Sequence, residues 1–183
     1  MVSLKRIHHV AYRCNDAKET ALFYKKMLGM DLTVSISESH VPSTGEPDPY
    51  MHIFLDAGQG NVLAFFELTG QKPMGRDENT PTWVQHIALE VGSLDELEKA
   101  KKHLEDNGLD VLGITNHGVF KSLYFFDPNG HRIELAANTG TDEQMKKLKD
   151  IAWDMLDEWA ETKQPPKHTN WLHDEEFLDK GLK

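Results

Sequence analysis

The chain is poor in cysteine and in long apolar runs. Cys14 is the single cysteine among 183 residues, so an intrachain disulfide is excluded and a reducing compartment such as the cytoplasm is expected. The longest apolar run, VLAFF at 62–66, is far shorter than the roughly 20 residues of a membrane span. The opening residues, MVSLKRIHHV, lack the apolar core of a signal peptide. We therefore expect a cytoplasmic protein with no membrane partner.

Positive charge is also scarce. Thirty acidic residues outnumber twenty basic ones, which gives a formal net charge of -10 and a pI of about 5.4. This balance argues against nucleic acid or an anionic membrane surface as the main partner. Hydrophobic residues make up 39% of the chain, which is enough to build a sizeable core.

The sequence contains an internal repeat. The stretches IHHVAYRCNDAKETALFY and VQHIALEVGSLDELEKAKKHL place His9 and His86 at matching positions 77 residues apart, and the same spacing separates Asp16 from Ser93. Asp16 and Ser93 are each followed three residues later by glutamate, which is the spacing of a capping box. A helix is therefore predicted to begin after each, with glycine stop signals near residues 29 and 108.

Three strand-like stretches follow each predicted helix. They cover residues 31–37, 50–56 and 61–68 in the first half, and residues 109–114, 119–126 and 131–137 in the second. Each half is therefore a βαβββ module, and the fold class is α+β with two tandem modules. We assign the modules to residues 1–70 and 71–138, and a C-terminal helix with a tail to residues 139–183.

Side chains alternate between the two faces of a strand, and this alternation assigns four candidate metal ligands to the sheet faces that point away from the helices. His9 and His86 lie in the first strand of each module, on the face away from the following helix, and we assign Glu67 and Glu134 of the last strands to that face as well. A carboxylate buried in an apolar strand is costly unless it has a partner, so a metal ion is the simplest explanation of Glu134. Two histidines and one carboxylate form the set that holds Fe(II) with open positions.

The DPNG stretch at 127–130 predicts how the last two strands pair. Asp127 begins a type I turn, and Gly130 in the left-handed conformation would complete a three-residue hairpin loop. That loop places Tyr124 across from Glu134 on the same face, whereas a two-residue loop would pair Tyr124 with Ile133. We favour the three-residue loop, because Gly130 stands where a left-handed residue is needed.

The paired modules resemble the vicinal oxygen chelate superfamily over about residues 6–138. This superfamily includes glyoxalase I, extradiol ring-cleavage dioxygenases, fosfomycin resistance enzymes and bleomycin resistance proteins. The resemblance implies a curved sheet around a metal, with His9, His86 and Glu134 at ligand positions. Glu67 stands where glyoxalase I has a fourth ligand.

The segment 115–134 is similar to the signature of extradiol dioxygenases. The matching positions are Thr115, His117, Leu123, Tyr124, Asp127, Pro128, Gly130 and Glu134. This similarity implies that Glu134 binds Fe(II) and that Tyr124 hydrogen-bonds a bound catecholate. It implies that His117 belongs to the shell of residues around the substrate. The expected reaction is ring cleavage of a catechol-type aromatic with O2.

Two other functions stay open. If Glu67 serves as fourth ligand or base, a Zn(II), Ni(II) or Mn(II) site of the glyoxalase or epimerase kind is favoured, with isomerase chemistry next to a carbonyl. A metal-free relative of the bleomycin resistance proteins would instead use the cavity to bind a drug. The sequence leaves a homo-oligomer open in each case.

A third helix is predicted after the second module. Thr141 and Gln144 have capping-box spacing. The residues that recur at a 3-4 spacing after this cap are Met145, Leu148, Ala152, Met155 and Trp159. We expect this stripe to pack against its own domain, with closure of the pocket mouth or pairing with a second subunit as alternatives. The stretch NWLHDEEFL at 170–178 is expected to be a short apolar anchor.

Overall fold

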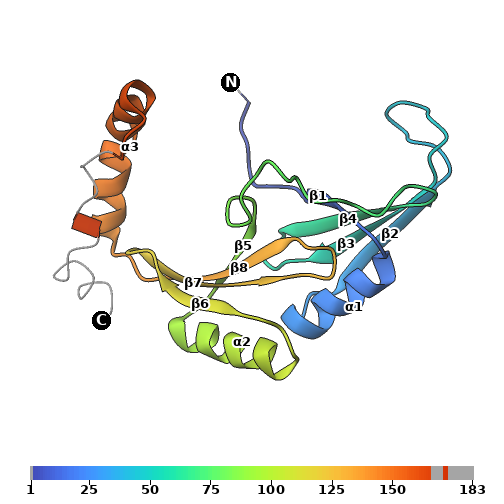
Figure 1. Ribbon diagram of the computed structural model, residues 1–183, viewed down its shortest axis with the longest axis horizontal. Helices are drawn as coiled ribbons and strands as arrows, with labels where there is room; N and C mark the ends of the chain where they lie inside the picture. Colours follow the sequence, from blue (N-terminus) through green and yellow to red (C-terminus); the bar gives the residue numbers. More distant parts are fainter. Residues whose placement is uncertain (1, 166–170, 173–183) are drawn as a thin grey trace. The chain divides into compact units, whose positions relative to one another are not determined.

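A computed structural model of the protein describes residues 2–165, 171 and 172 (Figure 1). Its elements are β1 (Val10–Cys14), α1 (Ala17–Leu28), β2 (Leu32–Glu38), β3 (Tyr50–Asp56), β4 (Val62–Leu68), β5 (Ile87–Val91), α2 (Leu94–Asp106), β6 (Leu112–Asn116), β7 (Phe120–Phe126), β8 (Arg132–Asn138) and α3 (Asp142–Thr162). This order confirms the two predicted βαβββ modules. The strands form two four-stranded sheets in the orders β1-β4-β3-β2 and β5-β8-β7-β6.

Contacts divide the chain into two compact units. The first unit contains Met1–Ile87 together with Phe126–Ile133, and the second contains Ala88–Phe125 together with Glu134–Lys183. The tip of the β7–β8 hairpin thus groups with the first unit, although the sequence repeat assigns it to the second module. Each unit is described below by itself.

The first unit is built on α1 and its sheet. Asp16 caps the helix, since its Oδ1 accepts a 2.7 Å hydrogen bond from the Glu19 N–H, and Gly29 ends it at φ 70°. The sheet pairs β1 parallel to β4, while β2, β3 and β4 pair antiparallel. Tyr24 of α1 is fully buried and lies 5.2 Å from the Phe65 ring of β4. The Phe65 side of the sheet is therefore its helix face.

The other face of this sheet carries a histidine among aromatic rings. His52 of β3 stacks on Phe66 at 3.6 Å between ring centroids and lies 4.1 Å from Phe54. Opposite them on β2, Val34 and Ile36 are 45% and 40% exposed. This sheet is thus apolar on both faces, and α1 covers one of them.

The second unit is organised around α2 and the sheet of β5 to β8. Ser93 caps α2 by accepting from the Glu96 N–H at 3.2 Å, and the Glu96 carboxylate accepts from the Gly92 N–H at 2.8 Å. The predicted Ser93 cap is therefore present, but the Glu96 carboxylate bonds the residue before the cap rather than Ser93 itself. Leu97 and Leu104 of the helix are fully buried. Leu123, Phe125 and Leu135 of the strands complete the apolar core.

The C-terminal helix α3 begins at the predicted capping box of Thr141 and Gln144. Its stripe differs from the prediction, because Met145 and Trp159 are 50% and 45% exposed and Trp153 is 74% exposed. The half-covered apolar side is instead that of Leu148, Ile151 and Met155. None of the described helices, α3 included, combines the length and apolar character needed to cross a membrane. The predicted anchor at 170–178 lies outside the described residues, apart from Trp171 and Leu172.

Candidate active site

The β7–β8 hairpin has the predicted three-residue loop. The Asp127 N–H donates to the His131 carbonyl at 3.0 Å, and the Gly130 N–H donates to the Asp127 carbonyl at the same distance. Gly130 has φ +84°, the left-handed conformation that a side chain would strain. Asp127 is buried, and its carboxylate accepts from the His131 N–H at 2.8 Å and from the Tyr24 hydroxyl at 3.1 Å. The register that follows from this loop is therefore fixed by several bonds at one turn.

Within the second unit, this register brings Tyr124 to Glu134. The Tyr124 hydroxyl donates to Glu134 Oε1 at 3.2 Å, which confirms the predicted cross-strand pairing. His117 Nε2 lies 2.8 Å from the same hydroxyl. Since the phenol proton is given to the carboxylate, His117 must present Nε2–H to the phenol oxygen. The three side chains thus form a directed chain from His117 through Tyr124 to Glu134.

Glu134 is a buried carboxylate, 3% exposed, between the buried apolar residues Ile133 and Leu135. Taking a charged carboxylate out of water is costly, and the Tyr124 phenol offsets part of that cost. A divalent cation supplies the opposite charge that such a group needs. The donor chemistry at Glu134 therefore fits a metal ligand.

His9 lies immediately before β1, in the first unit. Its Nδ1 is 2.8 Å from Nδ1 of His8, and its ring lies 5.7 Å from Phe54 and 6.3 Å from His52. A hydrogen bond at Nδ1 orients the ring and leaves Nε2 as the atom for a metal. This arrangement fits the predicted ligand role of His9.

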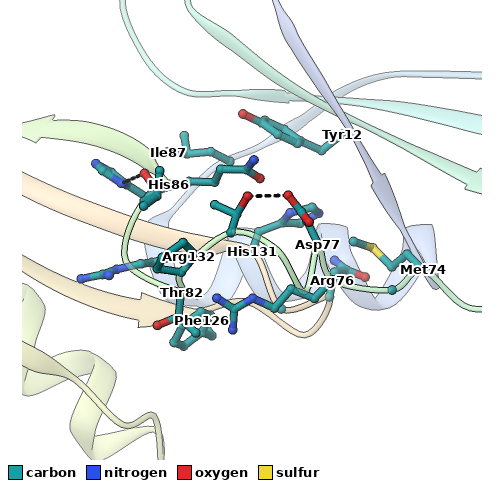
Figure 2. A pocket seen from close by; sticks show the side chains of 17 residues that line it. Tyr12, Met74, Arg76, Asp77, Thr82, His86, Ile87, Phe126, His131 and Arg132 are labelled. Carbon is teal, nitrogen blue, oxygen red and sulfur yellow. Dashed lines mark hydrogen bonds between the residues drawn. The ribbon is translucent and has the colours of Figure 1, made fainter. Parts of the chain in front are cut away.

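His86 lies immediately before β5 and lines a cavity of about 740 Å³ within the first unit (Figure 2). Its Nδ1 lies 2.9 Å from the Val84 carbonyl, which can only accept, so Nδ1 carries the proton. The lone pair of the neutral ring is then on Nε2. A backbone carbonyl on the other nitrogen is the usual way in which a metal-binding histidine is oriented.

Glu67 does not lie on the face predicted for it. Its Oε2 accepts a 2.7 Å hydrogen bond from the backbone N–H of Ala17, the first residue of α1. Glu67 alternates with Phe65 along β4, and Phe65 packs on the helix. The assignment of Glu67 to the face away from α1 is therefore wrong. Its role as a fourth ligand or base remains a prediction that this contact does not favour.

The predicted ligands belong to both units. His9, His86 and Glu67 are in the first unit, and Glu134 is in the second with Tyr124 and His117. Within either unit taken alone, the described residues contain no group of three His, Cys, Asp or Glu side chains that could hold a metal ion. The set of His9, His86 and Glu134 therefore stays a prediction, whereas the Tyr124 pairing is an observed contact.

His52 is a residue that the repeat did not identify. Its Nε2 is buried and finds no hydrogen-bond partner among the described residues. Burial, with a smaller contribution from His9, lowers the pKa of His52 below the usual histidine value. The repeat hid this residue because His52 has no counterpart in the second module. The sequence does show that His52 and Phe54 are two residues apart in a predicted strand, which places them on the same face of the sheet.

The comparison with protein families decides the ancestry of this arrangement. The model of the glyoxalase/bleomycin resistance protein/dioxygenase superfamily matches residues 6–135. The chain belongs to this superfamily. Other members of the superfamily are therefore the proteins with which the histidines, the buried glutamate and the tyrosine are compared.

Two kinds of relative share sequence with this superfamily member. It is 30% identical to the putative ring-cleaving dioxygenase MhqA of Bacillus subtilis over 136 residues, which are 72% of this chain and 40% of MhqA. It is 28% identical to the metallothiol transferase FosB of Staphylococcus saprophyticus over 162 residues, which are 84% of this chain and 95% of FosB. The chain thus spans well under half of MhqA but nearly all of FosB.

Solved structures support the fold. Glyoxalase I of Leishmania major superposes with a TM-score of 0.56 at 21% identity, covering 86% of this chain and 99% of that one. The fosfomycin resistance protein FosX of Listeria monocytogenes superposes with a TM-score of 0.55 at 19% identity, covering 79% and 100%. The FosX structure contains Mn(II). At these identities the likeness shows the fold alone.

Proposed function

We propose that the protein is an Fe(II)-dependent extradiol dioxygenase that opens the ring of a catechol-type aromatic with O2. The observation that carries this proposal is the Tyr124 hydroxyl, which lies 3.2 Å from Glu134 Oε1 and 2.8 Å from His117 Nε2. A phenol beside a metal-binding carboxylate is placed to hydrogen-bond an oxygen of the bound substrate. The 30% identity to a putative ring-cleaving dioxygenase supports the same chemistry.

The use of Glu67 supports a three-ligand rather than a four-ligand site. Because the Glu67 carboxylate caps α1 through Ala17, the remaining set is His9, His86 and Glu134. Two histidines and one carboxylate leave the open positions that a chelating diol and O2 need. Fe(II) bound there would lower the pKa of the catechol hydroxyls and hold both reactants side by side.

The side chains have separate tasks in this proposal. His8 and the Val84 carbonyl orient the rings of His9 and His86 through their Nδ1 atoms. His117 holds the Tyr124 hydroxyl so that its proton points to Glu134. When a substrate oxygen lies next to Glu134, that phenol proton can turn to the substrate and stabilise its negative charge.

A direct test uses protein purified without oxygen, stripped with a chelator and reloaded with Fe(II). We expect one O2 to be consumed per ring opened, because both oxygen atoms enter the product, and a yellow ring-fission product to appear from at least one member of a catechol panel. The stripped protein and the Zn(II)-loaded protein serve as controls. A fully Fe(II)-loaded protein that consumes no O2 with any catechol would refute the proposal.

A second candidate is metal-dependent thiol transfer. It is favoured by the FosB alignment, which covers 95% of that relative. The same metal-loaded preparations can be incubated with fosfomycin and a low-molecular-weight thiol, with loss of free thiol as the measurement. Thiol consumption without catechol cleavage would replace the first proposal by this one. Conversion of a hemithioacetal by the Zn(II) or Ni(II) form would instead indicate the glyoxalase-type isomerase.

A further inference from the structure

The cavity in front of His86 differs in charge from the rest of the chain. Its charged lining residues are two arginines, Arg76 and Arg132, and one aspartate, Asp77. The whole chain has thirty acidic residues against twenty basic ones. An acidic protein that places an excess of guanidinium groups around a cavity builds a local site for an anion.

The one acid of the cavity is committed to its own loop. The Asp77 carboxylate accepts from the Asn79 N–H at 2.9 Å and from the Thr80 hydroxyl. These bonds lower the pKa of Asp77, with the Thr80 hydroxyl as the largest cause, so the carboxylate stays charged at neutral pH. Figure 2 shows Asp77 among the side chains that line the cavity. Asp77 therefore shapes the loop that carries Arg76.

The loop that carries Arg76 is anchored to β1 and the residue after it on one side and closed by a local turn on the other. Before it, the Met74 N–H donates to Asn15 Oδ1 at 3.0 Å, and Arg13 donates to the Lys72 carbonyl. After it, the Val84 N–H donates to the Pro81 carbonyl at 3.1 Å. A Pro- and Gly-containing linker held at these points presents its arginine from a defined position, which lowers the ordering cost of binding.

Aromatic side chains also line the same cavity. Tyr12 is 37% exposed, and its ring lies 5.1 Å from the His131 ring. His131 is fixed in turn by a 2.7 Å bond from Nε2 to the Arg13 carbonyl. Phe126, 48% exposed, is a second aromatic residue of the lining. Exposed rings next to a cavity offer area for an aromatic ligand.

We infer that this cavity binds an aromatic carboxylate, with the ring against Tyr12 and the carboxylate recognised by Arg76. Guanidinium groups bind carboxylates through two parallel hydrogen bonds. The exposed rings of the lining favour an aromatic carboxylate over a bare inorganic anion, which could not pack against them. This inference deepens the proposed function, on which it rests for one step: since His86 lines the cavity, the substrate class becomes a catechol that carries a ring carboxylate.

The test measures binding without metal or O2, so its failure is distinct from a failure of ring cleavage. Calorimetry on the metal-free protein compares benzoate with benzamide, its neutral counterpart of nearly equal shape. We expect benzoate to bind at least about tenfold more tightly, the size of one charge-assisted hydrogen bond. The preference should weaken as salt is added, because the recognition is ionic.

Two variants locate the charge. Arg76→Gln should weaken benzoate binding about tenfold or more and leave benzamide binding unchanged. Lys72→Gln removes a nearby positive charge of the same loop whose backbone, not its side chain, makes the anchoring bond, and it should change neither affinity by more than about twofold. Thermal melting of both variants checks that each remains folded.

Three results would overturn the inference. They are equal affinity for benzoate and benzamide, no binding of either, and an Arg76→Gln variant that is folded and binds benzoate normally. Tighter binding of phenylphosphonate than of benzoate would overturn the carboxylate assignment in favour of a phosphonate. Benzoate binding by a protein that opens no catechol would leave the cavity as described and remove the proposed dioxygenase.

Discussion

Glu67 lies in the last strand of the first module and Glu134 in the last strand of the second, and these two carboxylates lie in different surroundings. Glu67 accepts from the first backbone N–H of α1 at 2.7 Å, where a negative charge also complements the helix dipole. Glu134 is buried and accepts from the Tyr124 hydroxyl. Glu67 is the sixth residue of β4, whereas Glu134 is the third residue of β8, so the two glutamates occupy strand positions of opposite parity. The position of each glutamate along its strand therefore decides which partners its carboxylate meets.

The largest expected effect is on metal content, when a candidate ligand histidine is compared with a histidine outside the site. His86→Ala should abolish stoichiometric metal binding, because the two remaining ligands hold a divalent ion too weakly. Metal content of anaerobically loaded protein is the measurement. His40→Ala, a change in the exposed 39–49 loop, is the matched control and should keep one metal per chain. Unchanged metal in His86→Ala would remove this residue from the site.

The next effect belongs to the contact that distinguishes the second module. Tyr124→Phe should lower turnover of a catechol about 10- to 150-fold, because a hydrogen bond from the phenol to a charged oxygen contributes roughly 1.5–3 kcal/mol. Metal content should change little, and the free energy of unfolding of the metal-free protein should fall by about 1–3 kcal/mol, because the buried Glu134 carboxylate loses this donor. Full turnover by the Phe variant would make Tyr124 a packing residue only.

A smaller effect is expected from the corresponding carboxylate of the first module. Glu67→Gln should lower the free energy of unfolding by about 0.3–1 kcal/mol, the range for a negative charge at a helix N-terminus, because the glutamine carbonyl can still accept from the Ala17 N–H. Urea unfolding measures this change. Asp56→Asn, a change of an exposed carboxylate at the end of β3, controls for the loss of charge. If Glu67→Gln is as stable as the parent, the negative charge at the helix N-terminus contributes nothing and the comparison between the modules weakens.

The smallest expected effect concerns the Cys14 thiol on the helix face of the first module, which should not react in the native protein. Cys14 is 1% exposed, and burial raises the pKa of its thiol to about 11. At pH 8 only about one thiol in a thousand is ionised, so the native protein should not react with a disulfide reagent over minutes. The thiol becomes reactive above its raised pKa or after denaturation. Rapid native labelling at pH 8 would show that this face opens.

The sequence allowed some of these features to be predicted and hid others for physical reasons. The DPNG turn fixes a loop length, and loop length fixes which residues face each other, so the Tyr124–Glu134 contact was predictable. The face of Glu67 was not, because the run VLAFFEL is apolar at consecutive positions and gives no alternation to count from. The capping box predicted the start of α3, but apolar residues around most of that helix left its covered side undetermined.

The loop from Gly70 to Gln85 shows a further limit of sequence reasoning. Its composition predicts a linker between modules. Its anchoring instead depends on side chains far away in the chain, among them Arg13 and Asn15. Such long-range partners have no local signature. The cavity that Arg76 lines was therefore not predicted.

The most direct test of the difference between the modules is Fe(II) titration of Glu134→Gln and Glu67→Gln side by side under anaerobic conditions. Both changes remove one carboxylate charge and keep the size of the side chain. We predict that Glu67→Gln binds one Fe(II) per chain like the parent, and that Glu134→Gln loses stoichiometric binding while remaining folded. Loss of iron from Glu67→Gln with retention by Glu134→Gln would contradict the assignment of the site to the second module's glutamate.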